Sequence, residues 1–253
     1  MQFDTCLIDG DMLAYVASTS VQKEIDWGDG LWTLHAYLED AQAAFTTDTN
    51  YIIHTLKNKH NIDITDSKKI YCFSDNNLFR KDINPNYKSN RANTRKPVCY
   101  NALVAWIKDN YDCMTIDNCE ADDCISSNID EHSIIISGDK DFNTVEGYFY
   151  DFKRDTLHYT TKQEAMYNTF VQALAGDRID GYFGCPKIGI VTAKKILDKV
   201  KDKTFCGYWS AAKEQFEKAG LTEWDLLVNY RMAHLLTHKE IREGVNLKNY
   251  SHI

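Results

Sequence analysis

Four short apolar runs, each leading directly into acidic residues, constrain the fold of this chain more than any other feature. These runs, which we interpret as buried strands, are Thr5–Ile8, Lys69–Phe73, Asp112–Ile116 and Ser133–Ile136. Between them lie segments with the helical spacing of apolar residues, such as Leu31–Leu56 and Val98–Asn110. Strands that alternate with helices predict a mostly parallel sheet flanked by helices. Two further strands, Gly147–Phe152 and Thr156–Thr160, are predicted to form an antiparallel edge, and residues 162–238 are predicted to be helical.

Carboxylates follow every one of the four predicted strands. In chain order they are Asp9 and Asp11, then Asp75, then Asp117, Glu120, Asp122 and Asp123, and finally Asp139 and Asp141. The carboxyl ends of parallel strands lie along one edge of a sheet, where open α/β folds place their ligands. Two carboxylates about 6 Å apart repel by roughly 3 kcal/mol at an effective dielectric constant of about 20. Such a cluster therefore predicts bound cations, and hard oxygen ligands suit Mg²⁺ or Mn²⁺.

Each carboxylate taken alone has a simpler interpretation. A single Asp at a strand end is usually a turn or N-cap residue. Glu120, Asp122 and Asp123 open a predicted helix, where the helix dipole favours negative charge in any case. Four such coincidences on one predicted edge favour a metal site. Two divalent ions about 3.5–4 Å apart can activate a water and stabilise the leaving oxygen in phosphodiester hydrolysis.

A basic segment lies between the second and third predicted strands. From Arg80 to Lys96 there are six basic residues and one acidic residue, in a chain whose net charge is −8. A helix after Pro85 would place Lys88, Arg91 and Arg95 on one face. A solvated charged helix is the alternative. Because the segment follows Asp75 directly, contact with nucleic-acid phosphates is the better interpretation.

A turn rich in glycine follows the predicted strands. It runs from Gly176 to Gly189, and helical character resumes over Ile190–Lys199. Backbone N–H groups at the N-terminus of a helix suit a DNA phosphate, and Lys194 and Lys195 add positive charge. A simple linker between two helices is the alternative.

In this order the motifs resemble those of the 5′→3′ exonuclease and flap endonuclease family, particularly its phage-type members. The matching runs are LIDGD, FR…YKSNR, EADD, SGDKDF and GDRIDGYFGCPKIGIVTAKKIL, over residues 7–197. The resemblance implies a PIN-like α/β nuclease core over residues 1–161, with a mostly parallel central sheet and a short basic helical arch at 77–98. It also implies a helical region at 162–253 with a helix-three-turn-helix motif at 174–200.

The resemblance also assigns roles to residues. Carboxylates for a first metal ion would be Asp9, Asp75, Glu120, Asp122, Asp123 and Asp139. Asp141, Asp177 and Asp180 would join Asp139 around a second. Lys88 and Arg91 would act as catalytic residues that stabilise charge on the scissile phosphate. Contacts with DNA are expected from Arg80, Arg95, Lys96, Gly184, Lys187, Gly189, Thr192, Lys194 and Lys195. The turn at 184–194 would also hold K⁺ by its carbonyl groups.

The chain departs from the family pattern at several positions. Asp11 stands where Thr or Ser is more usual, so its role is open. Gly181 replaces the usual Asn, and Tyr182-Phe183 replaces the usual Ile-Pro. Val191 takes the place of a usual lysine, so no single lysine is identified as the anchor for duplex DNA.

Together these features predict a hydrolase that cleaves DNA from 5′ ends with two Mg²⁺, for which Mn²⁺ can substitute, and leaves 5′-phosphates. Its substrates would be duplexes with a 5′ end, nick or flap, and RNA–DNA hybrids, in phage replication, primer removal or DNA degradation. We expect a monomer. We also expect a location in the reducing host cytoplasm, since no signal peptide or membrane span is evident. No cysteine pair fits a metal motif. The nine proposed ligands account for the acidic balance, because −8 + 9 leaves +1 elsewhere.

Two rival functions stay open at this point. Asp9-Gly-Asp11, Ser74 and Gly138-Asp139 fit a haloacid-dehalogenase-type phosphatase, which would hydrolyse small phosphate monoesters. That interpretation leaves the acidic run at 120–123 and the basic segment unexplained. A non-catalytic DNA-binding module is the second rival, although such a descendant would have lost some of the nine acidic residues.

Overall fold

A computed structural model describes residues 2–91 and 94–244 of the chain. Residues 92–93 of the predicted arch and 245–253 of the predicted helical region lie outside the described residues. The chain divides into two compact units. The first comprises Met1–Asp75, Arg95–Asp139 and Gly147–His158, and the second comprises Asn76–Thr94, Lys140–Glu146 and Tyr159–Ile253. The predicted boundary at residue 161 stays a prediction.

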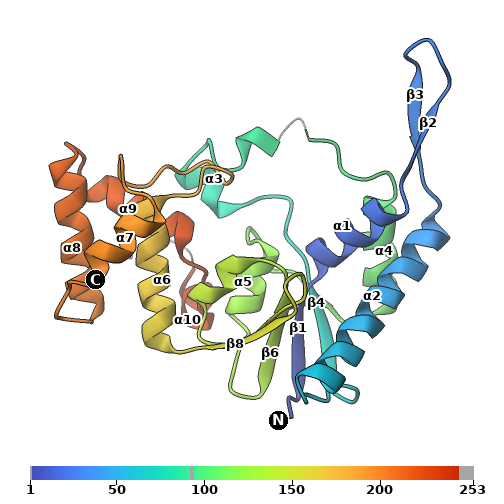
Figure 1. Ribbon diagram of the computed structural model, residues 1–253, viewed down its shortest axis with the longest axis horizontal. Coiled ribbons are helices and arrows are strands. Elements are labelled where there is room, and N and C mark those ends of the chain that lie inside the picture. The colour runs from blue at the N-terminus through green and yellow to red at the C-terminus, as the bar shows by residue number, and fades with distance from the viewer. Residues whose placement is uncertain (1, 92–93, 245–253) are drawn as a thin grey trace. The chain divides into compact units, whose positions relative to one another are not determined.

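A six-stranded sheet organises the first unit (Figure 1). Its strands, in spatial order, are β5 (Cys113–Met114), β4 (Lys68–Cys72), β1 (Thr5–Asp9), β6 (Ser133–Ser137), β7 (Gly147–Asp151) and β8 (Thr156–Thr160). Adjacent strands from β5 to β7 are parallel, with Leu7 opposite Ile70 and Ile135. The prediction of a mostly parallel sheet is therefore confirmed. β7 runs parallel to β6, and β8 lies beside β7 at the edge of the sheet, where antiparallel pairing of these two strands stays a prediction.

Helices cover the central strands. Figure 1 shows α1 (Gly10–Ser20), α2 (Leu38–Lys59) and α4 (Tyr100–Asn110) on one side of the strands and α5 (Ala121–Ser126) on the other. The strands are buried because their apolar side chains meet both layers, and β6 is buried along its whole length. A core of fully buried side chains, including Phe45, Leu56 and Ile134, joins the sheet to α2. This packing fixes the end of each central strand.

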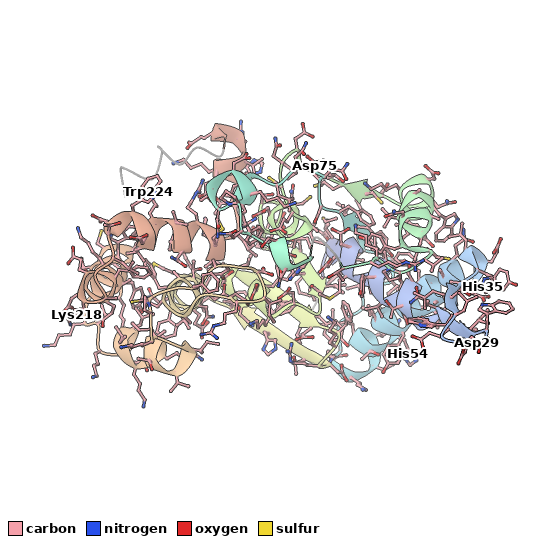
Figure 2. The ribbon with its side chains drawn as sticks, turned by 90° about the horizontal axis from the view of Figure 1, so that it is seen from above. Asp29, His35, His54, Asp75, Lys218 and Trp224 are labelled. Atoms are coloured by element: carbon pink, nitrogen blue, oxygen red, sulfur yellow. The ribbon has the colours of Figure 1, made fainter. Side chains whose placement is uncertain are left out.

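A β-hairpin replaces the first part of one predicted helix. Residues 31–37 were expected to be helical, but β2 (Lys23–Asp26) and β3 (Trp32–His35) pair antiparallel, and α2 begins only at Leu38. The reason is local. Gly28 and Gly30 adopt φ of +83° and +76° in the connecting loop, which favours a reversal of the chain over a helix. Figure 2 shows Asp29 and His35 of the hairpin at one end of this unit, away from Asp75.

The second unit is mainly helical. Its elements are α3 (Phe79–Ile83), the 3-10 helices η1 (Ser89–Arg91) and η2 (Lys140–Thr144), α6 (Lys162–Ala175), α7 (Ile190–Leu197), α8 (Phe205–Lys218), α9 (Glu223–Ala233) and α10 (His238–Glu243). Phe170, Leu174, Tyr208 and Phe216 lie in its separate apolar core. No α-helix is found between Pro85 and Tyr100 in the described part of the chain, so the predicted helical arch is not confirmed. None of the helices in the described ranges has the length and apolar character that a membrane crossing needs.

Candidate functional site

Asp9 lies at the centre of the carboxylates in the first unit. It ends β1 and caps α1, where its Oδ1 accepts a hydrogen bond from Met12 N at 2.9 Å. Its Oδ2 accepts from the hydroxyl of Ser137 at 2.8 Å. The same Ser137 oxygen accepts from Asp139 N at 3.1 Å, so one buried hydroxyl holds the ends of β1 and β6 together. Ser137 is not among the site residues predicted from the sequence, although its position before Gly138-Asp139 marks the strand end.

The pKa of Asp9 reflects this crowding. Burial raises it to about 6, and the charges of Asp11 and Asp139 act in the same direction, against the hydrogen bonds from Met12 and Ser137. A carboxylate that is buried near like charges is costly to ionise without a cation. The structure therefore places Asp11 and Asp139 within electrostatic reach of Asp9, as the strand order predicts.

This raised pKa predicts a pH dependence of stability for the metal-free protein. Protonated Asp9 is favoured on folding, so its contribution to the free energy of unfolding is fully present below pH 3.8. It is lost as the pH rises to about 6. When the pH is raised from 5 to 7 in EDTA, the free energy of unfolding should therefore decrease less for Asp9→Asn than for the wild type. Denaturant titrations at the two pH values measure this decrease. Equal losses in the two proteins would contradict the assignment.

The remaining carboxylates of this unit gather around the start of α5. Asp75 Oδ2 accepts from Asn118 N at 2.8 Å. Glu120 caps α5 in a capping box with Asp123, whose Oδ2 accepts from Glu120 N at 3.2 Å. Glu120 and Asp123 are buried, whereas Asp122 is half-buried. The capping explanation thus applies to Glu120 and Asp123, but burial of both carboxylates exceeds what a helix N-terminus needs.

Three further carboxylates belong to the second unit. Asp141 Oδ1 accepts from Gln172 Nε2 at 2.9 Å, and Asp177 Oδ2 lies 3.5 Å from Lys140 Nζ. Tyr182 is buried beside them, and its pKa is raised well above the ordinary value, first by burial and then by the charges of Asp141, Asp177 and Asp180. The three carboxylates therefore lie within electrostatic reach of one phenol. In the sequence, Tyr182 stands out only as a departure from the family pattern.

The basic pair predicted to act in catalysis contacts one of these carboxylates. Arg91 Nη2 donates to Asp180 Oδ1 at 2.5 Å, and Lys88 Nζ lies 3.8 Å from Asp180 Oδ2. The backbone N–H of Lys88 also donates to the carbonyl of Asp180 at 2.9 Å. Lys88 has φ of +52°, so it belongs to a turn before η1 instead of the expected helix. The structure therefore joins Lys88, Arg91 and Asp180 without a helical arch.

Arg80 has a different environment from the one we expected. It was predicted to contact a phosphate, yet it is 1% exposed. Its Nη2 donates to the carbonyl of His234 at 2.9 Å, and its guanidinium lies 4.7 Å from the ring centroid of Phe79. These contacts attach α3 to the end of α9. A buried guanidinium cannot reach DNA, so Arg80 is not carried into the proposal.

The other residues predicted to contact DNA lie mostly on the surface. Those that are exposed are Arg95, Lys96, Lys187, Gly189, Thr192, Lys194 and Lys195. Gly184 is buried, and its N–H donates to Asn229 Oδ1 at 2.8 Å. Lys96 Nζ also lies 4.3 Å from the ring centroid of Tyr100. Exposure leaves these cations available to a phosphate, whereas Gly184 serves the turn itself.

The turn between α6 and α7 depends on two facing glycines. Gly176 and Gly184 have φ of +70° and +65°, and Cys185 N donates across the turn to the carbonyl of Leu174 at 2.8 Å. A Cβ added to Gly184 would lie 2.4 Å from Gly176 N. The glycines of the sequence predicted a turn here. In the structure it is a turn in which two backbone segments pack closely against each other.

Gly184→Ala should unfold this turn. The left-handed backbone and the collision with Gly176 together should lower the free energy of unfolding by at least about 2 kcal/mol. Gly189→Ala is the matched control, because an added Cβ there meets nothing within 4 Å. Urea denaturation of both variants checks the prediction, and a loss no greater for Gly184→Ala than for Gly189→Ala would refute it.

The donor chemistry suits hard divalent cations, because every proposed ligand is a carboxylate. As the side chains stand in residues 2–91 and 94–244, no three His, Cys, Asp or Glu side chains are grouped so as to hold a metal ion. Side-chain rotation would have to complete any such group. The chemistry of the ligands fits, and the individual coordination contacts stay a prediction.

Comparison with known proteins gives relatives over nearly the whole chain. No protein-family model matches the sequence. The exodeoxyribonuclease of Enterobacteria phage T3 is 26% identical over 270 residues, which cover 92% of this chain and 88% of the relative. The exonuclease of Escherichia phage T7 is 25% identical over 271 residues, with the same coverage of 92% and 88%.

Solved structures share the fold. The T5 5′-exonuclease with bound zinc ions has a TM-score of 0.65 at 14% identity, over 96% of this chain and 92% of that one. A bacteriophage T5 flap endonuclease in a pseudo-enzyme–product complex with DNA and metal ions has a TM-score of 0.63 at 14% identity, over 99% and 94%. This likeness confirms the predicted α/β fold with a mainly parallel sheet flanked by helices.

Proposed function

We propose that this chain, which belongs to the 5′→3′ exonuclease and flap endonuclease family, is a metal-dependent nuclease that hydrolyses DNA from 5′ ends. The observation that carries the proposal is the gathering of Asp9, Asp11 and Asp139 at adjacent strand ends, where burial, followed by the charges of Asp11 and Asp139, raises the pKa of Asp9. Metal ions and DNA in the T5 structures support the same activity here. The two rival functions have no counterpart among these relatives.

Two divalent ions, Mg²⁺ or Mn²⁺, are the cofactors that we propose. One would be held by the carboxylates at the strand ends and around α5, namely Asp9, Asp75, Glu120, Asp122, Asp123 and Asp139. The other would be held by Asp141, Asp177 and Asp180 of the second unit. When bound, such ions activate a water and stabilise the leaving oxygen of a phosphodiester. Burial of Asp9, Glu120 and Asp123 supports this role, since charge of this density is costly without a cation.

The residues of the chain itself would bind and orient the DNA. Lys88 and Arg91 carry fixed positive charge beside Asp180, and we propose that they hold the scissile phosphate and stabilise charge that develops on it. Exposed cations in the turn and α7, with Arg95 and Lys96, would contact the phosphates of the duplex. Thr192 and the backbone of Gly189 lie at the exposed start of α7, which suits a phosphate.

One assay tests the whole proposal. End-labelled single-stranded, duplex, nicked and 5′-flapped DNAs are incubated with Mg²⁺, with Mn²⁺ and with EDTA, and product lengths and end groups are read. We expect cleavage from the 5′ end with a 5′-phosphate, and no cleavage in EDTA. A gel shift without cleavage would favour a DNA-binding module, and hydrolysis of a small phosphate monoester alone would favour a phosphatase.

Several finer points also stay proposals. Product size in the same assay separates an exonuclease from a flap endonuclease, and an RNA–DNA hybrid tests RNA as a substrate. A role in phage replication, primer removal or DNA degradation follows from the relatives alone. The K⁺ site in the turn, the monomeric state and the host-cytoplasm location rest on the family resemblance and on composition.

A further inference from the structure

Asp11 has both carboxylate oxygens engaged by other parts of the first unit. Its Oδ2 accepts from the backbone N–H of Ser74 at 2.8 Å, and its Oδ1 accepts from the hydroxyl of Tyr100 at 2.8 Å. Ser74 and Tyr100 are 63 and 89 residues away in sequence. A Thr or Ser, which the resemblance makes more usual at this position, offers a single hydroxyl oxygen in place of the two separate oxygens with which the carboxylate accepts these bonds.

The contact with Ser74 reaches two groups of proposed metal ligands. Ser74 immediately precedes Asp75, so the position of the Ser74 backbone determines where the Asp75 side chain starts from the chain. Its hydroxyl accepts from Ala121 N at 3.0 Å, at the first residue of α5. Asp11 therefore holds the end of β4, and the end of β4 in turn holds the start of the helix that carries Glu120, Asp122 and Asp123.

The contact with Tyr100 reaches the end of the basic segment. Tyr100 is the first residue of α4 and is 6% exposed. Lys96 Nζ lies 4.3 Å from the centroid of its ring. Burial, followed by the charge of Asp11 and the hydrogen bond to it, raises the pKa of Tyr100 above its ordinary value, which keeps the phenol protonated as a donor.

We propose that Asp11 is a positioning residue and not a metal ligand. By holding Ser74 and Tyr100 at once, it fixes Asp75 and the carboxylates at the start of α5 relative to the residues that follow the basic segment. This inference rests on the proposed nuclease function. It gives a role to the acidic residue that the family pattern leaves unexplained.

Three variants test the proposal. Asp11→Asn keeps an oxygen for Ser74 N and a polar group for Tyr100 but loses the charge. Asp11→Ala loses both contacts. Tyr100→Phe removes only the hydroxyl that donates to Asp11. Tyr15→Phe is the control, because Tyr15 packs against the ring of Tyr100 but is 45% exposed. The measurements are kcat and KM on a flapped DNA, and Mn²⁺ binding followed by calorimetry on the DNA-free protein.

A positioning role predicts a graded result. Asp11→Ala should lower kcat and weaken Mn²⁺ binding by about 10–100-fold, as outer-shell partners of metal ligands do, with little change in KM. Tyr100→Phe should have a smaller effect of the same kind, and Asp11→Asn should stay within about threefold of the wild type. Tyr15→Phe should match the wild type.

The contrary outcomes are distinct. If Asp11→Asn loses Mn²⁺ binding as severely as Asp11→Ala, then Asp11 is a ligand and the proposal fails. Wild-type kcat and Mn²⁺ binding in Asp11→Ala would also overturn it. Should Asp11→Ala fail to fold by circular dichroism, Tyr100→Phe decides, because unchanged kcat and Mn²⁺ binding there would refute the proposal. If the wild type binds Mn²⁺ but cuts no DNA, the nuclease function fails, and the binding data still decide the role of Asp11.

Discussion

Asp139→Asn should abolish DNA cleavage while DNA binding persists. Asp139 is a proposed ligand of the metal ion at the strand ends, and its backbone N–H donates to the Ser137 hydroxyl that binds Asp9. Asn keeps the size of the side chain and the backbone contact but removes the charge that a divalent ion needs. Since loss of outer-shell partners alone costs about 10–100-fold in metalloenzymes, we expect a loss of at least about 100-fold in kcat.

Single-turnover cleavage of a flapped DNA, with a gel shift in Ca²⁺, measures both properties of this variant. Asp109→Asn is the control, because this aspartate is exposed in α4 and has no part in the proposed site. Thermal denaturation confirms that both variants fold. Cleavage by Asp139→Asn at the rate of the control would remove Asp139 from the metal site.

Lys88→Ala combined with Arg91→Ala should have the second largest effect. Both cations lie beside Asp180, which is itself a proposed metal ligand. If they stabilise charge on the phosphate, their loss should lower kcat by about 10²–10³-fold or more, since one preorganised donor is worth that much elsewhere. Mn²⁺ binding should change much less than in Asp139→Asn.

A charge control separates catalysis from general attraction to DNA. Lys194→Ala combined with Lys195→Ala removes the same charge from exposed positions on α7. This control should raise KM and make it less sensitive to salt, with kcat almost unchanged. Equal kcat and KM effects in the two double variants would show that Lys88 and Arg91 act only by charge.

The central sheet could be predicted because its strands are short and continuously apolar. The run before Asp9 and the run Ser133–Ile136 are typical of strands that are covered on both faces, as in a parallel sheet, and the structure confirms both. The hairpin at residues 23–35 could not be read in the same way. Its side chains are mostly exposed on both faces, so no apolar period marks its strands.

The carboxylates of the candidate site could be predicted from the sequence, but the side chains that surround them could not. Carboxylates that follow parallel strands must lie along one edge of the sheet, and a single sequence is enough to predict this. The hydroxyl of Ser137, the phenol of Tyr182 and the contact of Tyr100 with Asp11 depend on side chains that meet across long stretches of sequence. Arg80 shows the same limit, because its charge suggested a phosphate contact, whereas packing against Phe79 and His234 buries it.

The hairpin of β2 and β3 has a consequence for solubility. Within the described residues it pairs with no third strand, and it exposes Trp27, Leu31 and Trp32 by 57–64%. Unpaired edges and exposed apolar side chains are the features by which copies of a protein aggregate. Glu24, Asp26 and Asp29 place negative charge beside these apolar side chains, and the repulsion between copies opposes self-association through the hairpin. The net charge of the whole chain nevertheless vanishes near the isoelectric point of about 5.5, so precipitation at that pH is the hazard that the hairpin creates in handling the protein.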